Sequence, residues 1–207
     1  MASLDASRAM LKTLGDDYYS PKGASTPATA GFRGQIGKGS ALPHALTTNE
    51  TIRKGQVLVT GSSANVGGYV SELERTMVVG EPWEKVIDFF KLMREAGEIA
   101  INAIEPGISF ATVDKKVRSF YRDNDLMDYW RHHTGHSIGF SGHEAPYLDH
   151  NDERELKPGM VVTVEPGLYV PDFAGFRHSD TVLVTKGGSR RLTYYPRELE
   201  ELIIPVA

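Results

Sequence analysis

The segment Arg131–Tyr169 reads RHHTGHSIGFSGHEAPYLDHNDERELKPGMVVTVEPGLY, and four of the seven histidines of the chain fall between Arg131 and His143. Glycines at positions 135 and 139 let the backbone approach a ligand or a neighbouring strand closely, which leaves the side chain of His136 free to point into a cleft. Core packing does not explain such a density of imidazoles. The segment therefore predicts a functional site.

The same segment places a carboxylate at the end of a strand. Glu165 follows the apolar run Met160–Val164 and is stopped by Pro166-Gly167. A polar side chain fixed by a turn at a strand end is positioned as site residues commonly are. For Glu165 alone, a solvated strand end is the competing interpretation, but its combination with the histidines favours a site.

Composition limits the class of protein. The chain has 207 residues, 40% of them hydrophobic and 24% charged, with a net charge of -4, which is typical of one soluble globular domain. The 23 Lys and Arg are scattered and outnumbered by 27 acids, so we expect no nucleic-acid partner. No signal peptide or membrane-spanning run is found, and we expect a cytoplasmic protein. Without cysteine there is neither a disulfide nor a thiolate metal site.

The first part of the chain contains few regular elements. The pattern over Ser3–Tyr19 predicts a marginal helix, and Pro21–Gly39, rich in Gly, Pro, Ser and Thr, predicts an irregular loop. His44 then follows Pro43 in what should be extended backbone at a strand end. This histidine is a candidate general acid or base, with a purely structural role as the alternative.

A strand pair comes next. Gly55–Thr60 predicts a strand, Gly61–Gly68 a hairpin loop, and Tyr69–Val79 a second strand. Alternation along the second strand puts Glu72 and Glu74 on one face. Two acids facing the same way are costly in a core unless they are paired or functional, whereas on a solvated face they would be ordinary surface residues.

Two helices and further strands follow. A long helix begins near Glu81-Pro82-Trp83, and Ser109 is the expected N-cap of a second helix ending near Asn124. The expected buried positions are Val86, Phe90, Met93, Gly97 and Ile101 in the first helix, and Val113, Val117 and Phe120 or Tyr121 in the second. Later strands are expected over Met160–Glu165, Phe176–Thr185 and Leu202–Ile204.

Two pairs of segments echo each other. Lys54–Val57 resembles Pro158–Val161 with an offset of 104 positions, and Arg75–Val79 resembles Asp180–Val184 with an offset of 105. A nearly constant offset predicts two related halves, each of which contributes a hairpin to one site.

Several ordered blocks resemble the creatinase, prolidase and aminopeptidase P superfamily, whose pita-bread fold is shared with methionine aminopeptidase. The blocks are SALPHALTTN (residues 40–49), GGYVSELERTMVVGEP (67–82), HTGHSIGFSGHEAP (133–146), LKPGMVVTVEPGLY (156–169), GFRHSDTVLVT (175–185) and YPRELEELI (195–203). The resemblance implies an α+β fold of two pseudo-twofold-related halves, with a curved antiparallel sheet and helices on its outer face. It implies a short N-terminal segment over residues 1–39, a pita-bread domain over 40–207, and a homodimer.

The metallopeptidases of that superfamily bind two divalent ions through two aspartates, a histidine and two glutamates. His136 matches the histidine and Glu165 the first glutamate. The first aspartate falls at about Thr60 or Gly61, the second at Glu72, and the last glutamate at Ser179. Too few anionic ligands remain for two ions, so we predict no dinuclear centre. Glu72, His136 and Glu165 are residual candidates for a single divalent ion.

Creatinase is the member that works without metal, and its Leu-Glu-Arg-Thr pattern matches Leu73–Thr76. The resemblance implies that His44 shuttles a proton while Glu74 and Glu165 act with it as catalytic residues. It also implies substrate-binding roles for His136, His143 and Arg177.

Three functions follow as hypotheses. The first is a hydrolase that cleaves a C–N bond in a small amino-acid-like or dipeptide substrate without a dinuclear metal centre and without another cofactor. The second is an Xaa-Pro metallopeptidase with a mononuclear or weak metal site. The third is an inactive pita-bread module that binds a peptide or a protein.

Overall fold

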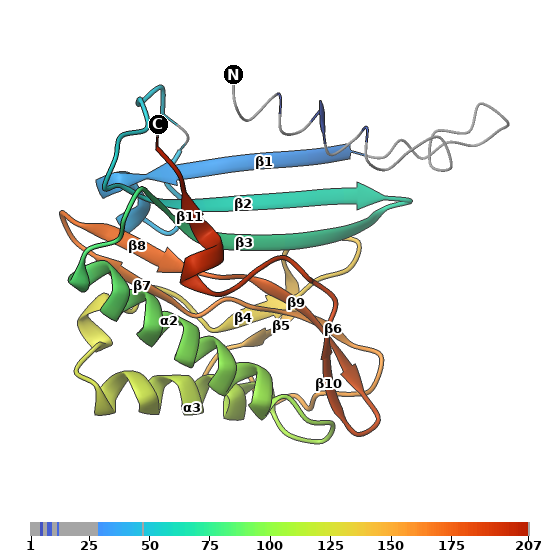
Figure 1. Ribbon diagram of the computed structural model, residues 1–207. Helices are drawn as coiled ribbons and strands as arrows, with labels where there is room; N and C mark the ends of the chain where they lie inside the picture. The colour runs from blue at the N-terminus through green and yellow to red at the C-terminus, as the bar shows by residue number, and fades with distance from the viewer. Residues whose placement is uncertain (1–4, 6–7, 10–11, 13–28, 47, 207) are drawn as a thin grey trace, which may run out of the picture.

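The computed structural model describes residues 5, 8–9, 12, 29–46 and 48–206. Two large sheets and one two-stranded sheet are covered by two helices (Figure 1). One sheet has the order β1-β2-β3-β11, with bounds β1 Thr29–Ile36, β2 Val57–Val66, β3 Tyr69–Val79 and β11 Ile203–Ile204. The second has the order β10-β9-β6-β4-β5, with bounds β10 Gly188–Arg191, β9 Asp180–Thr185, β6 Val161–Val164, β4 Gly135–Ser137 and β5 Glu144–Leu148. A separate pair is formed by β7 Gly167–Val170 and β8 Ala174–Arg177. Neighbouring strands are antiparallel, apart from β11, which runs parallel to β3.

The two sheets meet along β3. Glu74 and Ser179 exchange backbone hydrogen bonds of 3.1 and 3.0 Å, so that the break between β8 and β9 joins the middle of β3. Beside this bridge, Arg75 donates to Asp180 at 2.8 Å, and Arg197 Nε lies 2.9 Å from the same carboxylate. All three charged groups are buried. The two hairpins with the repeated sequence are therefore cross-linked by ionic and backbone contacts.

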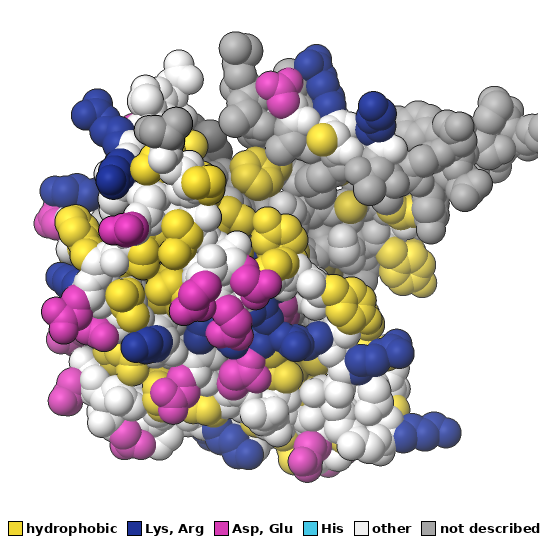
Figure 2. Space-filling model, viewed as in Figure 1, with side chains coloured by type: hydrophobic (Ala, Val, Ile, Leu, Met, Phe, Trp, Pro, Cys, Tyr) yellow, Lys and Arg dark blue, Asp and Glu magenta, His cyan; other side chains and the backbone are white. Residues whose placement is uncertain are grey.

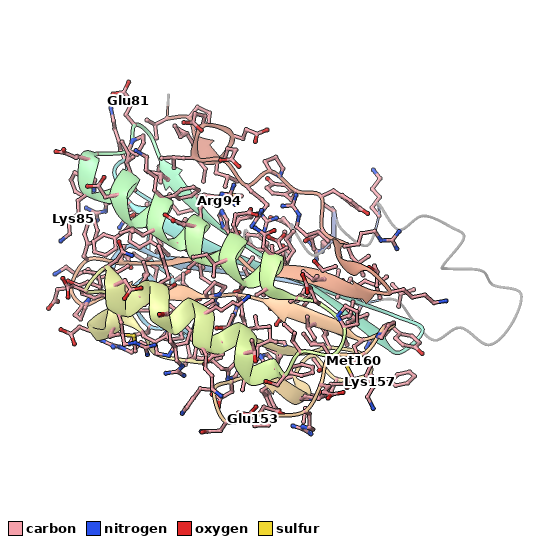
Figure 3. The ribbon with its side chains drawn as sticks, turned by 90° about the horizontal axis from the view of Figure 1, so that it is seen from below. Glu81, Lys85, Arg94, Glu153, Lys157 and Met160 are labelled. Atoms are coloured by element: carbon pink, nitrogen blue, oxygen red, sulfur yellow. The ribbon has the colours of Figure 1, made fainter. Side chains whose placement is uncertain are left out.

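The helices α2 (Glu84–Ala103) and α3 (Phe110–Asp123) lie side by side beneath the sheets, and Lys85 projects outward from α2 (Figure 3). The expected inward positions of both helices are buried, with Tyr121 rather than Phe120 taking the last one. Ser109 caps α3 by accepting a hydrogen bond from the backbone N–H of Thr112 at 3.2 Å. Burial of each large apolar side chain stabilises the fold by about 1.5–3 kcal/mol.

Short 3-10 helices complete the chain: η1 Gly37–Ala41, η2 Met127–Tyr129 and η3 Leu199–Leu202. On the face shown in Figure 2, acidic and basic side chains are interleaved. An ion-pair network joins α2 to the C-terminal segment: Arg94 contacts Glu98 and Glu198, and Arg197 also contacts Glu98. Among the described residues, no helix is both long and apolar enough to cross a membrane.

Several expectations about local structure were wrong. The predicted loop Pro21–Gly39 contains β1, which pairs with β2 along its whole length. Strand β2 continues to Val66, so that the hairpin turn is confined to Gly67 and Gly68, both with positive φ. Two consecutive glycines suit such a turn because they adopt positive φ without steric cost.

Two further segments differ from prediction. His44 lies in a turn that follows η1, and not in extended backbone at a strand end. The predicted strand Phe176–Thr185 is divided into β8 and β9, because His178 and Ser179 leave their own ladder and face β3. The predicted helix Ser3–Tyr19 lies mostly outside the described residues.

Candidate active site

The site begins with two rows of residues across the first sheet. Arg33 of β1 is opposite Gly61 of β2, which is opposite Glu74 of β3. A second row of paired residues lies two positions further along the strands and consists of Gly31, Ser63 and Glu72. Glu72 is the other acid of β3. Because alternate residues of a strand share a face, both acids point to the same side of the sheet.

Gly61 lets Arg33 reach across the middle strand. A Cβ at position 61 would lie 2.8 Å from Arg33 Nε and 2.9 Å from Glu74 Oε1, so the absent side chain is the space in which the two meet. The Nη2 of Arg33 donates to Glu74. Thr60, the other position matched to the first aspartate, has its hydroxyl bonded to the backbone carbonyl of Arg75 at 3.1 Å.

Behind Glu74 lies a second guanidinium. Arg177 donates to both carboxylate oxygens of Glu74, and its Nη1 donates to the carbonyl of Pro43 at 3.0 Å and to the hydroxyl of Tyr169 at 2.7 Å. The side chains of Arg177 and Glu74 are 1% and 2% exposed. Burial alone would lower the pKa of Arg177, but the carboxylate of Glu74 raises it above its usual value. Arg177 is therefore a buried permanent cation.

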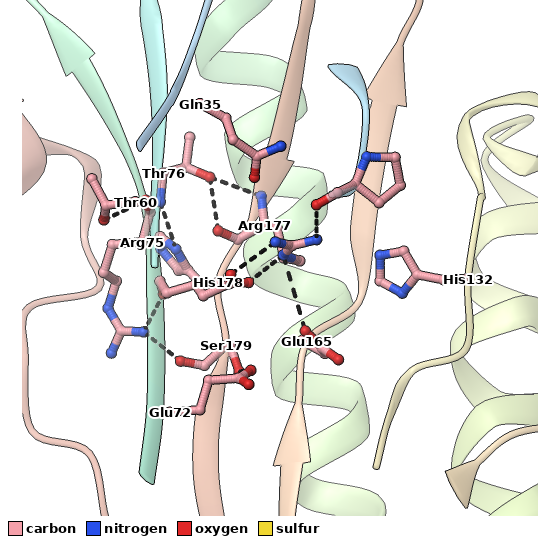
Figure 4. A network of polar contacts seen from close by, with 12 residues as sticks. Gln35, Thr60, Glu72, Arg75, Thr76, His132, Glu165, Arg177, His178 and Ser179 are labelled. Atoms are coloured by element: carbon pink, nitrogen blue, oxygen red, sulfur yellow. Dashed lines mark hydrogen bonds and ion pairs between the residues drawn. The ribbon is translucent and has the colours of Figure 1, made fainter. Parts of the chain in front are cut away.

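A second cluster joins the two halves. His136 Nε2 lies 3.2 Å from Glu165 Oε1 and 3.9 Å from Glu72 Oε2, and Ser179 donates to Glu72 at 2.8 Å. Figure 4 shows Arg177 facing Glu165, with Glu72 beside Ser179. The Nδ1 of His136 lies 3.0 Å from its acceptor, the carbonyl of Ser137, which directs the Nε2 of this imidazole toward the acids.

The protons of this cluster are unevenly distributed. Burial and the nearby Glu165 raise the pKa of Glu72 to about 7. Burial opposes ionisation of Glu165, but hydrogen bonding to His136 and the charge of Arg177 lower its pKa to about 2. Burial would lower the pKa of His136, but its contact with Glu165 raises it. At neutral pH, Glu165 is a carboxylate and Glu72 is near its titration midpoint.

Two exposed histidines complete the pocket. The ring of His143 lies 4.0 Å from that of His136, and the ring of His44 lies 6.3 Å from that of His143. Burial, followed by neighbouring positive charge, lowers the pKa of both, so both rings are mainly neutral at pH 7. The cavity holds about 410 Å³ and is lined by Gly31, Phe32, Arg33, His44, Gly61, Ser62, Ser63, Glu72, Glu74 and His143.

The site therefore brings most of the predicted residues together. Glu74, His44 and His143 line the cavity. Glu72 also lines it and lies 3.9 Å from His136, which in turn lies 3.2 Å from Glu165. Arg177 lies behind Glu74, with its donors directed at protein acceptors. Sequence reasoning missed Arg33, because the glycines around it hid the strand that carries it.

The residues do not fit a two-ion centre. Position 61 offers no ligand, Ser179 supplies only a hydroxyl that donates to Glu72, and Arg33 fills the space of the missing aspartate. The residues do offer ligands for a single ion, because one ligand atom from each of Glu72, His136 and His143 lies within 4.8 Å of the other two. Imidazole and carboxylate donors suit a borderline divalent ion.

The family model of metallopeptidase family M24 matches residues 16–186. The Xaa-Pro dipeptidase of Pyrococcus furiosus is 39% identical over 163 residues, which cover 79% of this chain and 47% of that protein. The chain thus spans about half the length of the curated relatives it matches.

Solved structures agree with this likeness. Dipeptidase PepE from Mycobacterium ulcerans superposes with a TM-score of 0.81 at 32% identity, covering 84% of this chain and 47% of that one. The N-terminal domain of a FACT complex subunit from chickpea gives a TM-score of 0.83 at 15% identity, covering 98% of this chain and 51% of that one, and shows the fold alone. The predicted α+β pita-bread fold is confirmed.

Proposed function

Because the chain belongs to metallopeptidase family M24, we propose that it hydrolyses a C–N bond in a small amino-acid-derived substrate such as a dipeptide, without a dinuclear metal centre. The observation that carries the second half of this proposal is the pairing of Arg33 with Glu74 across Gly61. A guanidinium lies where the first aspartate of a two-ion site would project. The guanidinium groups of Arg33 and Arg177 therefore neutralise the carboxylate of Glu74, a task that metal ions perform for the acids of the two-ion members of the family.

The remaining groups can supply acid–base chemistry. A neutral His44 is able to take a proton from a water molecule as that water adds to the carbonyl carbon. When the C–N bond breaks, the same imidazole returns the proton to the leaving nitrogen, so that an acid and an amine are released. Glu72, with its pKa of about 7, can donate to the developing oxyanion in its protonated form.

A mononuclear site is the second candidate, supported by one specific arrangement. The Nε2 of His136 faces Glu72, and His143 lies within reach of the same point. These three side chains would hold a divalent ion, which when bound polarises a carbonyl or a water molecule. The two candidates differ in whether a chelator abolishes turnover.

The test measures hydrolysis of a panel of Xaa-Pro dipeptides, lactams and guanidino compounds by the purified full chain, with and without a chelator. We expect turnover that survives chelation and falls at least 100-fold in His44→Ala, as is usual for loss of a proton-transfer group. His150→Ala is the matched control, since His150 is exposed and outside the cavity lining.

Three outcomes would count against the proposal. Turnover lost on chelation and restored by one equivalent of Mn²⁺ per chain favours the mononuclear site. Two tightly held equivalents overturn the absence of a dinuclear centre. No hydrolysis of any compound, together with saturable peptide binding, favours the binding module.

A further inference from the structure

We propose that Gln35 is a positioning residue for the reaction and that it acts through His44, whose imidazole it holds at a fixed place in the cavity. Gln35 lies near the end of β1 and is 4% exposed. This inference rests on the proposed function, in which His44 moves a proton. It adds a residue that does not itself touch the reacting atoms.

His44 occupies the third position of a four-residue turn. The turn begins at Leu42, whose carbonyl accepts a hydrogen bond from the backbone N–H of Ala45 at 3.3 Å. Pro43 takes the second position, which suits proline because its ring fixes φ near the value that common turns require there. The direction of the His44 side chain is therefore set by the backbone of Leu42 and Pro43.

Gln35 holds the carbonyl that closes this turn. Its Nε2 donates to the Leu42 carbonyl at 2.6 Å, and that oxygen can accept the turn bond as well because a carbonyl has two lone pairs. A buried amide is costly unless it is hydrogen-bonded, so a glutamine at this position needs such an acceptor. The next carbonyl, that of Pro43, accepts from Arg177 at 3.0 Å. Both carbonyls that precede His44 are thus held by buried side chains of neighbouring strands.

The segment before the turn is fixed as well. Helix η1 packs directly on β8, where a Cβ at Gly175 would lie only 1.9 Å from the carbonyl oxygen of Ser40. The Ser40 hydroxyl donates to the carbonyl of Gly37 at 2.6 Å and accepts from the backbone N–H of Gly175 at 2.8 Å. By contrast, Leu46, two residues after His44, is 88% exposed. The contacts that fix His44 therefore come from the segment that precedes it.

The imidazole of His44 has no hydrogen bond of its own to orient it. None of the described residues forms one with this ring, whereas the Nδ1 of His136 is held by the carbonyl of Ser137. An imidazole that transfers a proton must lie within hydrogen-bond reach of the reacting group. Because a displacement of about 1 Å can reduce a rate about 100-fold, the position of the turn that carries His44 matters for the chemical step.

The test is a double-mutant cycle between Gln35→Met and His44→Ala, with alanyl-proline as the substrate. Methionine keeps the length and nearly the volume of glutamine but cannot donate a hydrogen bond. We expect Gln35→Met to lower kcat about 10- to 100-fold and to change KM less than about threefold, because the histidine acts in the chemical step. In the His44→Ala background the same change should lower kcat less than about twofold, since the group that Gln35 positions is already absent.

A second measurement does not depend on turnover. The imidazole Cε1–H resonance of His44, assigned by its absence from the NMR spectrum of His44→Ala, should shift or broaden in Gln35→Met. Asn124→Leu is the matched control, because the Asn124 amide likewise donates to a backbone carbonyl, that of Phe120 at 2.9 Å, at the end of α3 and outside the cavity lining. This control should leave both kcat and the His44 resonance unchanged.

Equal losses of kcat in the two backgrounds overturn the inference, since they would show a general effect of Gln35 on the fold. An unchanged kcat of Gln35→Met in an active enzyme overturns it as well and leaves the proposed function intact. If the chain hydrolyses none of the compounds and the His44 resonance still moves in Gln35→Met, the positioning of His44 stands and the proposed function is removed. A resonance that stays in place in an inactive chain removes both.

Loss of fold can be recognised separately by a thermal melt of each variant. In Gln35→Met the Leu42 carbonyl keeps its bond from Ala45, so no buried acceptor is left without a partner and the fold should be retained. If Gln35→Met does not fold, Gln35→Asn takes its place in the cycle, because its amide is one methylene shorter and cannot reach the same carbonyl. The expected and the contradicting outcomes are then the same.

Discussion

At the scale of single residues, the contact between Glu74 and Arg177 is the most consequential. Both side chains are almost fully buried, so neither charge is solvated by water. Removing one partner of a buried pair is costly because the other charge is left without compensation. Loss of either partner should therefore destabilise the fold, because an unpaired charge would remain buried.

We predict that Arg177→Gln lowers the free energy of unfolding by about 3–5 kcal/mol, as measured by urea denaturation. Adding Glu74→Gln to this variant should recover part of the loss, because the orphaned carboxylate disappears. Arg190→Gln, at an exposed position of β10, should change stability by less than about 0.5 kcal/mol. A loss below about 1 kcal/mol in Arg177→Gln would show that Arg33 alone can hold Glu74.

At the scale of elements, α3 shows a helix whose start is set by one side chain. Ser109 accepts from the backbone of Thr112, which satisfies an N–H that the helix itself cannot. We predict that Ser109→Ala costs about 1 kcal/mol in chemical denaturation and that Ser109→Asp retains most of the stability. Ser119→Ala, on the exposed face of the same helix, should be neutral or slightly stabilising. Equal effects at both serines would contradict the capping role.

The elements also show what the sequence could reveal. Helix α3, the buried stripe of α2 and the bounds of β3 follow from local patterns, namely a cap, a 3.6-residue period and alternation. Strand β1 could not be found in this way, because Gly31 and Gly34 interrupt its alternation and its partner β2 begins 21 residues after β1 ends. Finding Arg33 in the site required that pairing first.

The residues chosen for the site lie close together in the structure. His136, His143, Glu72 and Glu165 were chosen from residue type and from the resemblance, and they lie together because β3, β4 and β6 converge. The burial of Arg177 behind Glu74 could not be read from the sequence, since it depends on how β8 leaves the second sheet.

At the scale of the whole molecule, buried neutral histidines couple stability to pH. Burial, followed by the charge of Arg75, lowers the pKa of His178 to about 3, so the unfolded chain binds its proton at a higher pH than the folded chain does. Stability from this group is complete above about pH 6.5 and falls as the pH drops toward 3. Glu72 and His136, whose pKa values are raised, act with the opposite sign.

The effect of His178 can be isolated by comparing the stability of the wild type with that of His178→Gln. The stability advantage of the wild type over His178→Gln should shrink between pH 6.5 and pH 4.5, by at most about 1.4 kcal/mol per pH unit. Urea denaturation of both proteins at several pH values measures this advantage, and the other titrating groups cancel. An advantage independent of pH would show that His178 contributes only its hydrogen bonds.

The joint formed by Arg75, Asp180 and Arg197 has a consequence for how the protein fails on heating. Glu72 of the site lies on one hairpin and Glu165 at the end of a strand of the other, with His136 between them. Because this joint connects the two hairpins in the interior, neither half can unfold and leave a working site in the other. Ligand binding and the circular-dichroism signal of the native fold should consequently be lost at the same temperature.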